Sequence, residues 1–170
     1  MCIIARLHSN YNHCMETEGE SSQTAIVISC SDSRLESTMS RLRLFLKENP
    51  SLSVTPESYF YRIQVPGPDG TLLGERGDDH KAVLLDDIRM LIATSGATAL
   101  IFIPHCDCAG CRVSDEVHEK NCTAVEKILH KEFNLTVLTL LDHPNTNGLP
   151  DWHFELVGYS HLKQSIVNLN

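Results

Sequence analysis

The stretch Ala25-Ile26-Val27-Ile28, which leads to Cys30, decides the fold. It is short, continuous and apolar, and three of its four side chains are β-branched. A strand has this composition when both of its faces are buried, as they are in a parallel sheet. Comparable runs at 59–65, 99–103 and 135–140 predict three further strands.

Segments with apolar side chains at helical spacing lie between these strands. The predicted helices cover 35–48, 78–95 and 114–133, and they end at Asn49-Pro50, Gly96 and Asn134. The alternation of strands and helices predicts an α/β domain with a mostly parallel central β-sheet that is flanked by helices. Residues 66–70, which are rich in proline and glycine, are predicted to be a loop.

The C-terminal part of the chain carries several aromatic residues. Residues 154–157 are predicted to add an edge strand to the sheet. We expect Trp152, Phe154 and Tyr159 to pack at the edge of the domain or at an interface rather than to contact a substrate.

The composition excludes several classes of protein. The chain of 170 residues has 14 basic and 22 acidic residues, a net charge of −8, which argues against binding to nucleic acid or to an anionic membrane. Its longest apolar run is far shorter than the roughly 20 residues that cross a bilayer. The first residues are not apolar for long enough to form a secretory signal, so we expect a cytoplasmic location. We expect one domain over 24–170, preceded by an irregular N-terminal arm over 1–23.

Side chains that bind metals follow two of the predicted strands. Cys30 ends the first strand, and His105 and Cys108 follow the third. Because the carboxyl ends of parallel strands share one edge of a sheet, these side chains can meet there. Zinc prefers thiolate and imidazole ligands, and three protein ligands leave a fourth position open for water. Asp32 and Arg34 are expected to form a charge-assisted pair that keeps Asp32 ionised.

Two motifs of the chain resemble the β-class carbonic anhydrases. The signature of that family is Cys-x-Asp-x-Arg followed by His-x-x-Cys, with a strand before each half. This chain has Cys30-Ser31-Asp32-Ser33-Arg34 and later His105-x-x-Cys108, and the resemblance extends over about residues 24–140. The two motifs together, in this order and on these elements, are far more specific than either one alone.

The resemblance implies that Cys30, His105 and Cys108 bind one Zn²⁺, and that Asp32 and Arg34 form a catalytic pair beside it. The reaction it implies is the reversible hydration of carbon dioxide to bicarbonate and a proton by zinc-bound hydroxide. It further implies that the partners are a small-molecule substrate and a second copy of the chain, in a homodimer or a larger homo-oligomer.

Several alternatives stay open. Residues 63–68 differ from the Arg/Lys-Asn-Ala-Gly segment of the family, which leaves hydrolysis of carbonyl sulfide or carbon disulfide, or a non-catalytic zinc-binding module, as rival functions. Either water or Asp32 could complete the zinc site. Cys108 and Cys111 form a Cys-x-x-Cys motif, which is also typical of thiol redox sites, and a second metal role for these cysteines stays open. We interpret Cys106 and Cys111 as packing residues around the zinc.

Overall fold

The computed structural model describes residues 23–35, 37–144 and 152–160. The predicted N-terminal arm therefore lies outside the described residues, except for its last residue. The strands are β1 (Thr24–Cys30), β2 (Tyr59–Val65), β3 (Ala99–Ile103), β4 (Thr136–Pro144) and β5 (Trp152–Ser160). The helices are α1 (Thr38–Glu48), α2 (Pro68–Leu73), α3 (Asp78–Ser95) and α4 (Asp115–Phe133), and η1 (Ser33–Leu35) is a short 3₁₀ turn. Within the described ranges, the structure has no helix with the length and apolarity that a membrane span requires.

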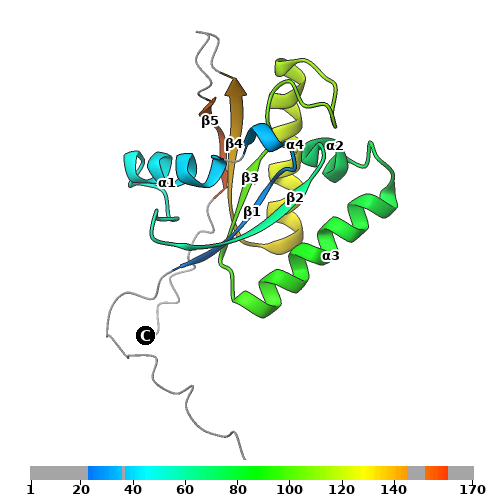
Figure 1. Ribbon diagram of the computed structural model, residues 1–170. Coiled ribbons are helices and arrows are strands. Elements are labelled where there is room, and N and C mark those ends of the chain that lie inside the picture. The colour runs from blue at the N-terminus through cyan, green and yellow to red at the C-terminus, as the bar shows by residue number, and fades with distance from the viewer. Residues whose placement is uncertain (1–22, 36, 145–151, 161–170) are drawn as a thin grey trace, which may run out of the picture.

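The five strands form one sheet in the order β2-β1-β3-β4-β5 (Figure 1). Strands β1 to β4 are parallel, and β5 runs antiparallel to β4. Helices α3 and α4 cover one face of the sheet, and α1 covers the other (Figure 1). The prediction of an α/β fold with a mostly parallel, helix-flanked sheet is confirmed, and the predicted edge strand is a longer strand than expected.

The central strands are apolar along their whole length because each packs into two cores. Successive side chains of a strand point to opposite faces of the sheet. Ile26 and Ile28 of β1 therefore pack in the core beneath α3 and α4, whereas Ala25 and Val27 pack in the core beneath α1. All four side chains are completely buried. Burial on both faces is the reason why β1 could be predicted from its composition.

Left-handed residues end two of the long helices, as predicted. Gly96 has a φ of 66°, and its amide donates a hydrogen bond to the carbonyl of Ile92 at the end of α3. Asn134 has a φ of 51°, and its amide donates to the carbonyl of His130 at the end of α4. Glycine and asparagine tolerate this conformation better than other residues, so the C-terminal ends of α3 and α4 could be predicted from the sequence.

The first helix begins later than predicted, at Thr38 rather than at residue 35. The Asp32 carbonyl accepts a hydrogen bond of 3.0 Å from the amide of Leu35, and Asp32 Oδ1 accepts one of 2.9 Å from the amide of Arg34. These contacts stabilise the 3₁₀ turn η1 between β1 and α1. The side chain of Asp32 thus competes locally with a continuous helix, as short acidic side chains often do.

The loop predicted over 66–70 is wrong in part, because α2 begins at Pro68. Proline is well suited to the first position of a helix, since its fixed φ is helical and its missing amide hydrogen would have no partner there. Gly67 and Gly74, both with left-handed backbones, flank the helix. A helix of six residues has too few turns to show an apolar period, so composition alone suggested a loop.

Gly67 lies against the backbone of Gly110, and we expect Gly67→Ala to destabilise the fold strongly. A Cβ at Gly67 would lie 2.6 Å from the carbonyl carbon of Gly110, and Gly67 also has a φ of 53°. The clash and the backbone strain should together cost about 2 kcal/mol or more of unfolding free energy.

Gly96→Ala is the matched control for this substitution. Gly96 has a similar φ, but a Cβ added there would have no neighbouring atom within 4 Å. The control should therefore cost only the backbone strain, about 1 kcal/mol. Urea unfolding of both variants measures the difference, and equal losses would contradict the close packing of Gly67 against Gly110.

Candidate metal centre

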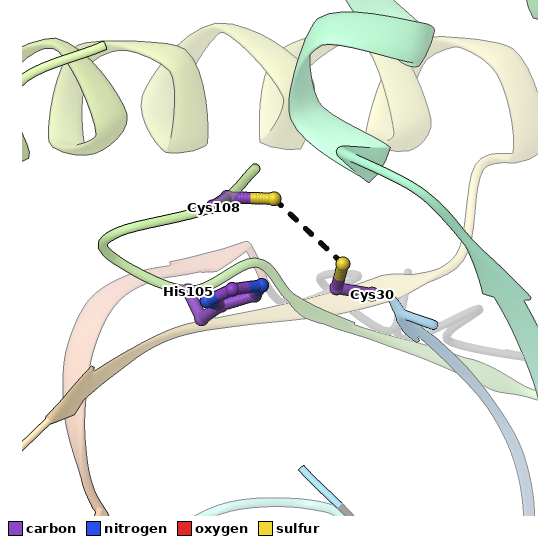
Figure 2. A group of neighbouring side chains, drawn as sticks. All are labelled: Cys30, His105 and Cys108. Atoms are coloured by element: carbon purple, nitrogen blue, oxygen red, sulfur yellow. Dashed lines mark hydrogen bonds between the residues drawn. The ribbon is translucent and has the colours of Figure 1, made fainter. Parts of the chain in front are cut away.

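Three buried side chains converge where β1 and β3 end. Cys30 is the last residue of β1, while His105 and Cys108 lie on the loop that follows β3 (Figure 2). The two strands are adjacent and parallel, with Ser29 opposite Ile103, so their carboxyl ends lie at the same edge of the sheet. This pairing brings together residues that are 78 positions apart in the chain.

The geometry of these side chains fits a metal ion. The sulfur atoms of Cys30 and Cys108 are 3.7 Å apart, and one ligand atom from each of the three residues lies within 4.8 Å of the other two. His105 Nδ1 is 2.7 Å from the carbonyl oxygen of Cys106, to which it can donate a hydrogen bond. His105 Nε2 is buried and has no hydrogen-bond partner among the described residues. The hydrogen bond at Nδ1 therefore leaves the lone pair of Nε2 free for a metal.

The two thiols of this group favour a single shared proton. Cys30 and Cys108 form a hydrogen bond that stabilises a thiolate on Cys108, and His105 adds to this effect. Together they lower the pKa of Cys108 to about 4. The same hydrogen bond and burial raise the pKa of Cys30 above its ordinary range. The thiolate is the form of cysteine that binds metal, so Cys108 is already in the state that a metal cation requires.

Arg34 holds Asp32 beside the three ligands. Its Nη2 donates to Asp32 Oδ2 at 2.7 Å and its Nε donates to both carboxylate oxygens. These hydrogen bonds lower the pKa of Asp32 to about 2, so the carboxylate is ionised at every physiological pH. Asp32 Oδ2 lies 3.9 Å from His105 Nε2, the free ligand atom. The expected pair is therefore formed next to the candidate metal centre.

Asp107, on the loop after β3, also accepts hydrogen bonds from Arg34. Arg34 Nη1 donates to Asp107 Oδ2 at 3.0 Å, and Nη2 donates to the Asp107 carbonyl at 3.1 Å. Asp107 adopts a left-handed backbone with a φ of 55°, which aspartate tolerates better than most residues. The guanidinium is thus fixed between two loops, one after β1 and one after β3.

Trp152 is a residue of this site that the sequence did not reveal. Its ring meets the His105 ring edge to face, with centroids 5.5 Å apart, and the Arg34 guanidinium lies 5.5 Å from the ring centroid. Trp152 lies on the edge strand β5, as expected, but it packs against residues of the site. Phe154 packs at the same edge, against Phe45 of α1. The sequence gives no signal for Trp152, because its place depends on how β5 pairs with β4.

Asp142 of β4 supports the loop that carries His105. Its backbone amide donates to the carbonyl of Pro104 and its carbonyl accepts from the amide of Cys106, both at 3.0 Å. Its side chain is fully buried and accepts hydrogen bonds of 2.6 and 2.7 Å from the two terminal nitrogens of Arg41. The ion pair thus fixes β4, α1 and the His105 loop relative to one another.

Arg41→Ala should destabilise the protein, and the loss should depend on pH. Removing Arg41 leaves the buried Asp142 carboxylate unpaired, which costs about 3 kcal/mol at neutral pH. Burial already raises the pKa of Asp142, against the effect of Arg41, and the variant raises it further. A carboxyl whose folded pKa is raised loses stability as pH rises through that pKa, so the deficit should be smaller at about pH 5 than at about pH 8.

Urea unfolding at both pH values measures this dependence. Arg89→Ala is the control, because Arg89 forms its ion pairs with Asp86 and Glu132 at the surface, and it should show a smaller loss with little pH dependence. A deficit for Arg41→Ala that does not change with pH would contradict the role given to Asp142.

A pocket of about 450 Å³ adjoins Cys108. Its lining residues are Arg34, Asp107, Cys108, Ala109, Arg112 and Val113. Two of these residues are arginines, so the pocket offers positive charge next to the three ligands. A small anion would be attracted to such a pocket.

Comparison with known proteins identifies the family of this chain. A family model described as "Putative carbonic anhydrase" matches residues 20–157, which include every residue of the candidate metal centre. The chain belongs to this carbonic anhydrase family. The resemblance seen in the two motifs is thereby confirmed, and the general kind of protein is that of a carbonic anhydrase. No curated protein sequence matches the chain.

Two solved structures of carbonic anhydrases are similar to the chain. One is a β-carbonic anhydrase, isoform I, from the protozoan Trichomonas vaginalis, with 15% identity and a TM-score of 0.42, over 83% of this chain and 87% of that one. The other is a β-carbonic anhydrase from the fungal pathogen Aspergillus fumigatus, with 14% identity and a TM-score of 0.40, over 80% of this chain and 76% of that one. With these low TM-scores, the family assignment rests on the sequence match alone.

Proposed function

We propose that this carbonic anhydrase family member catalyses the reversible hydration of carbon dioxide with a Zn²⁺ held by Cys30, His105 and Cys108. The observation that carries the proposal is the convergence of three buried ligand atoms within 4.8 Å, with an ionised carboxylate 3.9 Å from one of them. Two thiols and an imidazole form the kind of donor set that zinc prefers, and three protein ligands leave room for a fourth.

The metal and the protein have separate tasks in this reaction. When bound with one open position, Zn²⁺ lowers the pKa of a water molecule to roughly 7 and so supplies the nucleophile at neutral pH. Asp32, kept ionised by Arg34, would accept a hydrogen bond from that nucleophile and orient it toward the carbon of carbon dioxide. The Cys106 carbonyl fixes the His105 ring, and Asp142 with Arg41 fixes the loop that carries it. These protein groups thus position the nucleophile and the metal ligands rather than bonding to the substrate.

The charge of the adjoining pocket supports bicarbonate as the product. Hydration converts a neutral molecule to an anion and a proton, so a pocket with positive charge can bind the bicarbonate anion. Arg34 and Arg112 both line the pocket beside Cys108. Arg34 is already neutralised in part by Asp32 and Asp107, which leaves Arg112 as the main attraction for the anion.

A comparison of three linear substrates tests the proposal. Zinc-loaded full-length protein should hydrate carbon dioxide faster than the uncatalysed rate in a stopped-flow assay with a pH indicator. Carbonyl sulfide and carbon disulfide should be turned over more slowly, because their hydrolysis requires sulfide to leave. Faster turnover of either sulfur compound would instead identify a related hydrolase, and turnover of none of the three would favour a non-catalytic zinc module.

The cytoplasmic location stays a prediction. We also infer, from the family resemblance, that the protein forms a homodimer or a larger homo-oligomer. Analytical ultracentrifugation of the full chain tests the oligomeric state. A sedimentation coefficient of a 19.0 kDa monomer across the accessible concentrations would contradict it.

A further inference from the structure

A second group of side chains that could hold a metal ion adjoins the first, because Cys111 packs in one cluster with Cys30 and Cys108. It joins Asp69 of α2, Cys111 of the loop after β3, and His118 of α4, and one ligand atom from each lies within 4.8 Å of the other two. Asp69 and His118 are completely inaccessible to solvent, and Cys111 is 5% exposed. A carboxylate, a thiol and an imidazole that are all buried together need a physical explanation, because each loses its hydration on burial.

Hydrogen bonds among these residues satisfy only part of their polar atoms. Asp69 Oδ2 lies 2.8 Å from His118 Nδ1 and accepts a further hydrogen bond of 3.2 Å from Asn121 Nδ2. Asp69 Oδ1 and His118 Nε2 are buried without any hydrogen-bond partner in the described part of the chain. A buried carboxylate oxygen and a buried imidazole nitrogen without partners are costly, and both are ligand atoms for metals.

A second carboxylate reaches the same thiol. Glu75 Oε2 lies 3.8 Å from Cys111 Sγ, and the Glu75 amide donates to the Gly70 carbonyl at 2.9 Å, which holds Glu75 at the end of α2. Gly70 makes this approach possible. A Cβ on Gly70 would lie 2.9 Å from Glu75 Oε2 and 3.4 Å from Cys111 Sγ. The backbone of α2 therefore leaves a space into which the carboxylate and the thiol both extend.

The charges in this group favour a cation. Burial, the negative charge of Asp69 and that of Glu75 raise the pKa of the Cys111 thiol to about 12. Hydrogen bonds from His118 and Asn121 outweigh the burial of Asp69 and hold its pKa below the ordinary value, so its carboxylate is ionised. Among the described residues, the hydrogen bonds and ion pairs of this group involve no Lys or Arg side chain. A divalent cation would balance the carboxylates and bind the thiol as thiolate.

We propose that Asp69, Cys111 and His118 form a second metal site, which takes Zn²⁺, with Glu75 as a fourth ligand. Sulfur and imidazole ligands select zinc over magnesium or calcium, and four protein ligands close the site to substrate, so its role is structural. The bound ion would join α2, the loop after β3 and α4. It shares no ligand with the Cys30 site, and the proposal does not rest on carbon dioxide hydration.

Such a site would also explain the unusual sequence after β2. Residues 63–68 differ from the family segment, and α2 begins at the last of them, Pro68. Asp69 is the second residue of α2, and Cys111 lies three residues after Cys108. An ion between them would hold α2 against the loop whose other cysteine belongs to the first site. The Cys-x-x-Cys motif is then divided between two metal sites.

Zinc content per chain tests the proposal. Elemental analysis of the full-length protein, after zinc loading and dialysis, should give two ions per chain. Cys30→Ser and Cys111→Ser should each retain one, and the double variant should retain none. One ion per chain in the natural protein, unchanged by Cys111→Ser, would overturn the second site. Because metal content is measured without substrate, an inactive protein with two ions would refute the proposed function but not this site.

A spectroscopic test does not depend on removing Cys111. In the Cys30→Ser protein loaded with Co²⁺, a thiolate-to-cobalt absorption band should persist, and His118→Gln in the same background should remove it. Circular dichroism confirms that both proteins are folded. A cobalt-loaded Cys30→Ser protein without such a band would overturn the proposal, as would a band that His118→Gln leaves unchanged.

Discussion

Replacing Cys108 with serine is expected to abolish carbon dioxide hydration and to release one zinc ion per chain. Cys108 is the thiol whose pKa Cys30 and His105 lower to about 4, so it contributes the preferred thiolate of the first site. A serine hydroxyl in the same place is not ionised at neutral pH and binds zinc far more weakly. The rate in a stopped-flow assay should fall to the uncatalysed value, and elemental analysis should show the lost ion.

Cys106→Ser is the matched control for this experiment. Cys106 lies on the same loop and is equally buried, but its sulfur lies 3.2 Å from His143 Nδ1 rather than among the three ligands. The backbone carbonyl of Cys106, which holds His105, remains in the variant. Cys106→Ser should therefore keep its zinc and its activity. If Cys108→Ser retained both as well, the assignment of Cys108 as a ligand would be wrong.

Replacing Asp32 with asparagine should lower kcat by about 10²- to 10³-fold while the zinc stays bound. Asparagine preserves the shape of the side chain but accepts only through its carbonyl oxygen, and it carries no charge to balance Arg34. The charged hydrogen-bond acceptor that we assign to orienting the nucleophile would be lost, and a loss of this size is within the range seen when a positioned side chain of a reaction site is removed. Retained zinc separates this effect from the loss of a ligand.

Asp107→Asn is the control for the Asp32 variant. Asp107 also accepts a hydrogen bond from Arg34, but its side chain is 78% exposed, against 17% for Asp32. Its loss should reduce kcat by much less, because the Asp107 carbonyl still accepts from Arg34. Equal reductions in the two variants would mean that the position of Arg34, rather than the carboxylate of Asp32, controls the rate.

The sequence was sufficient for the fold and for most of the first site because both depend on simple rules. The central strands are buried on both faces, which leaves continuous apolar runs such as residues 25–28. Parallel strands end at one edge of their sheet, which is why Cys30 and His105 could be expected to meet. Helix α2 was not predicted, because its six residues include a proline and a glycine and are too few to show the apolar spacing of a helix.

The residues that the sequence did not reveal all depend on long-range packing. Trp152 reaches His105 only because β5 pairs antiparallel with β4, and Asp142 meets Arg41 across 101 positions of the chain. Asp69 and His118 are 49 positions apart, and no sequence motif links them. A single sequence carries no signal for such pairs, since neither spacing nor composition distinguishes them from surface residues.

A zinc titration that follows activity tests the proposed function most directly. Metal-free, full-length protein is titrated with Zn²⁺, and carbon dioxide hydration is measured at each addition. The rate should rise with added zinc and reach a plateau, and the Cys30→Ser protein should show no rise at any zinc concentration. A natural protein that binds zinc at Cys30, His105 and Cys108 but never exceeds the uncatalysed rate would contradict the proposal that this site hydrates carbon dioxide.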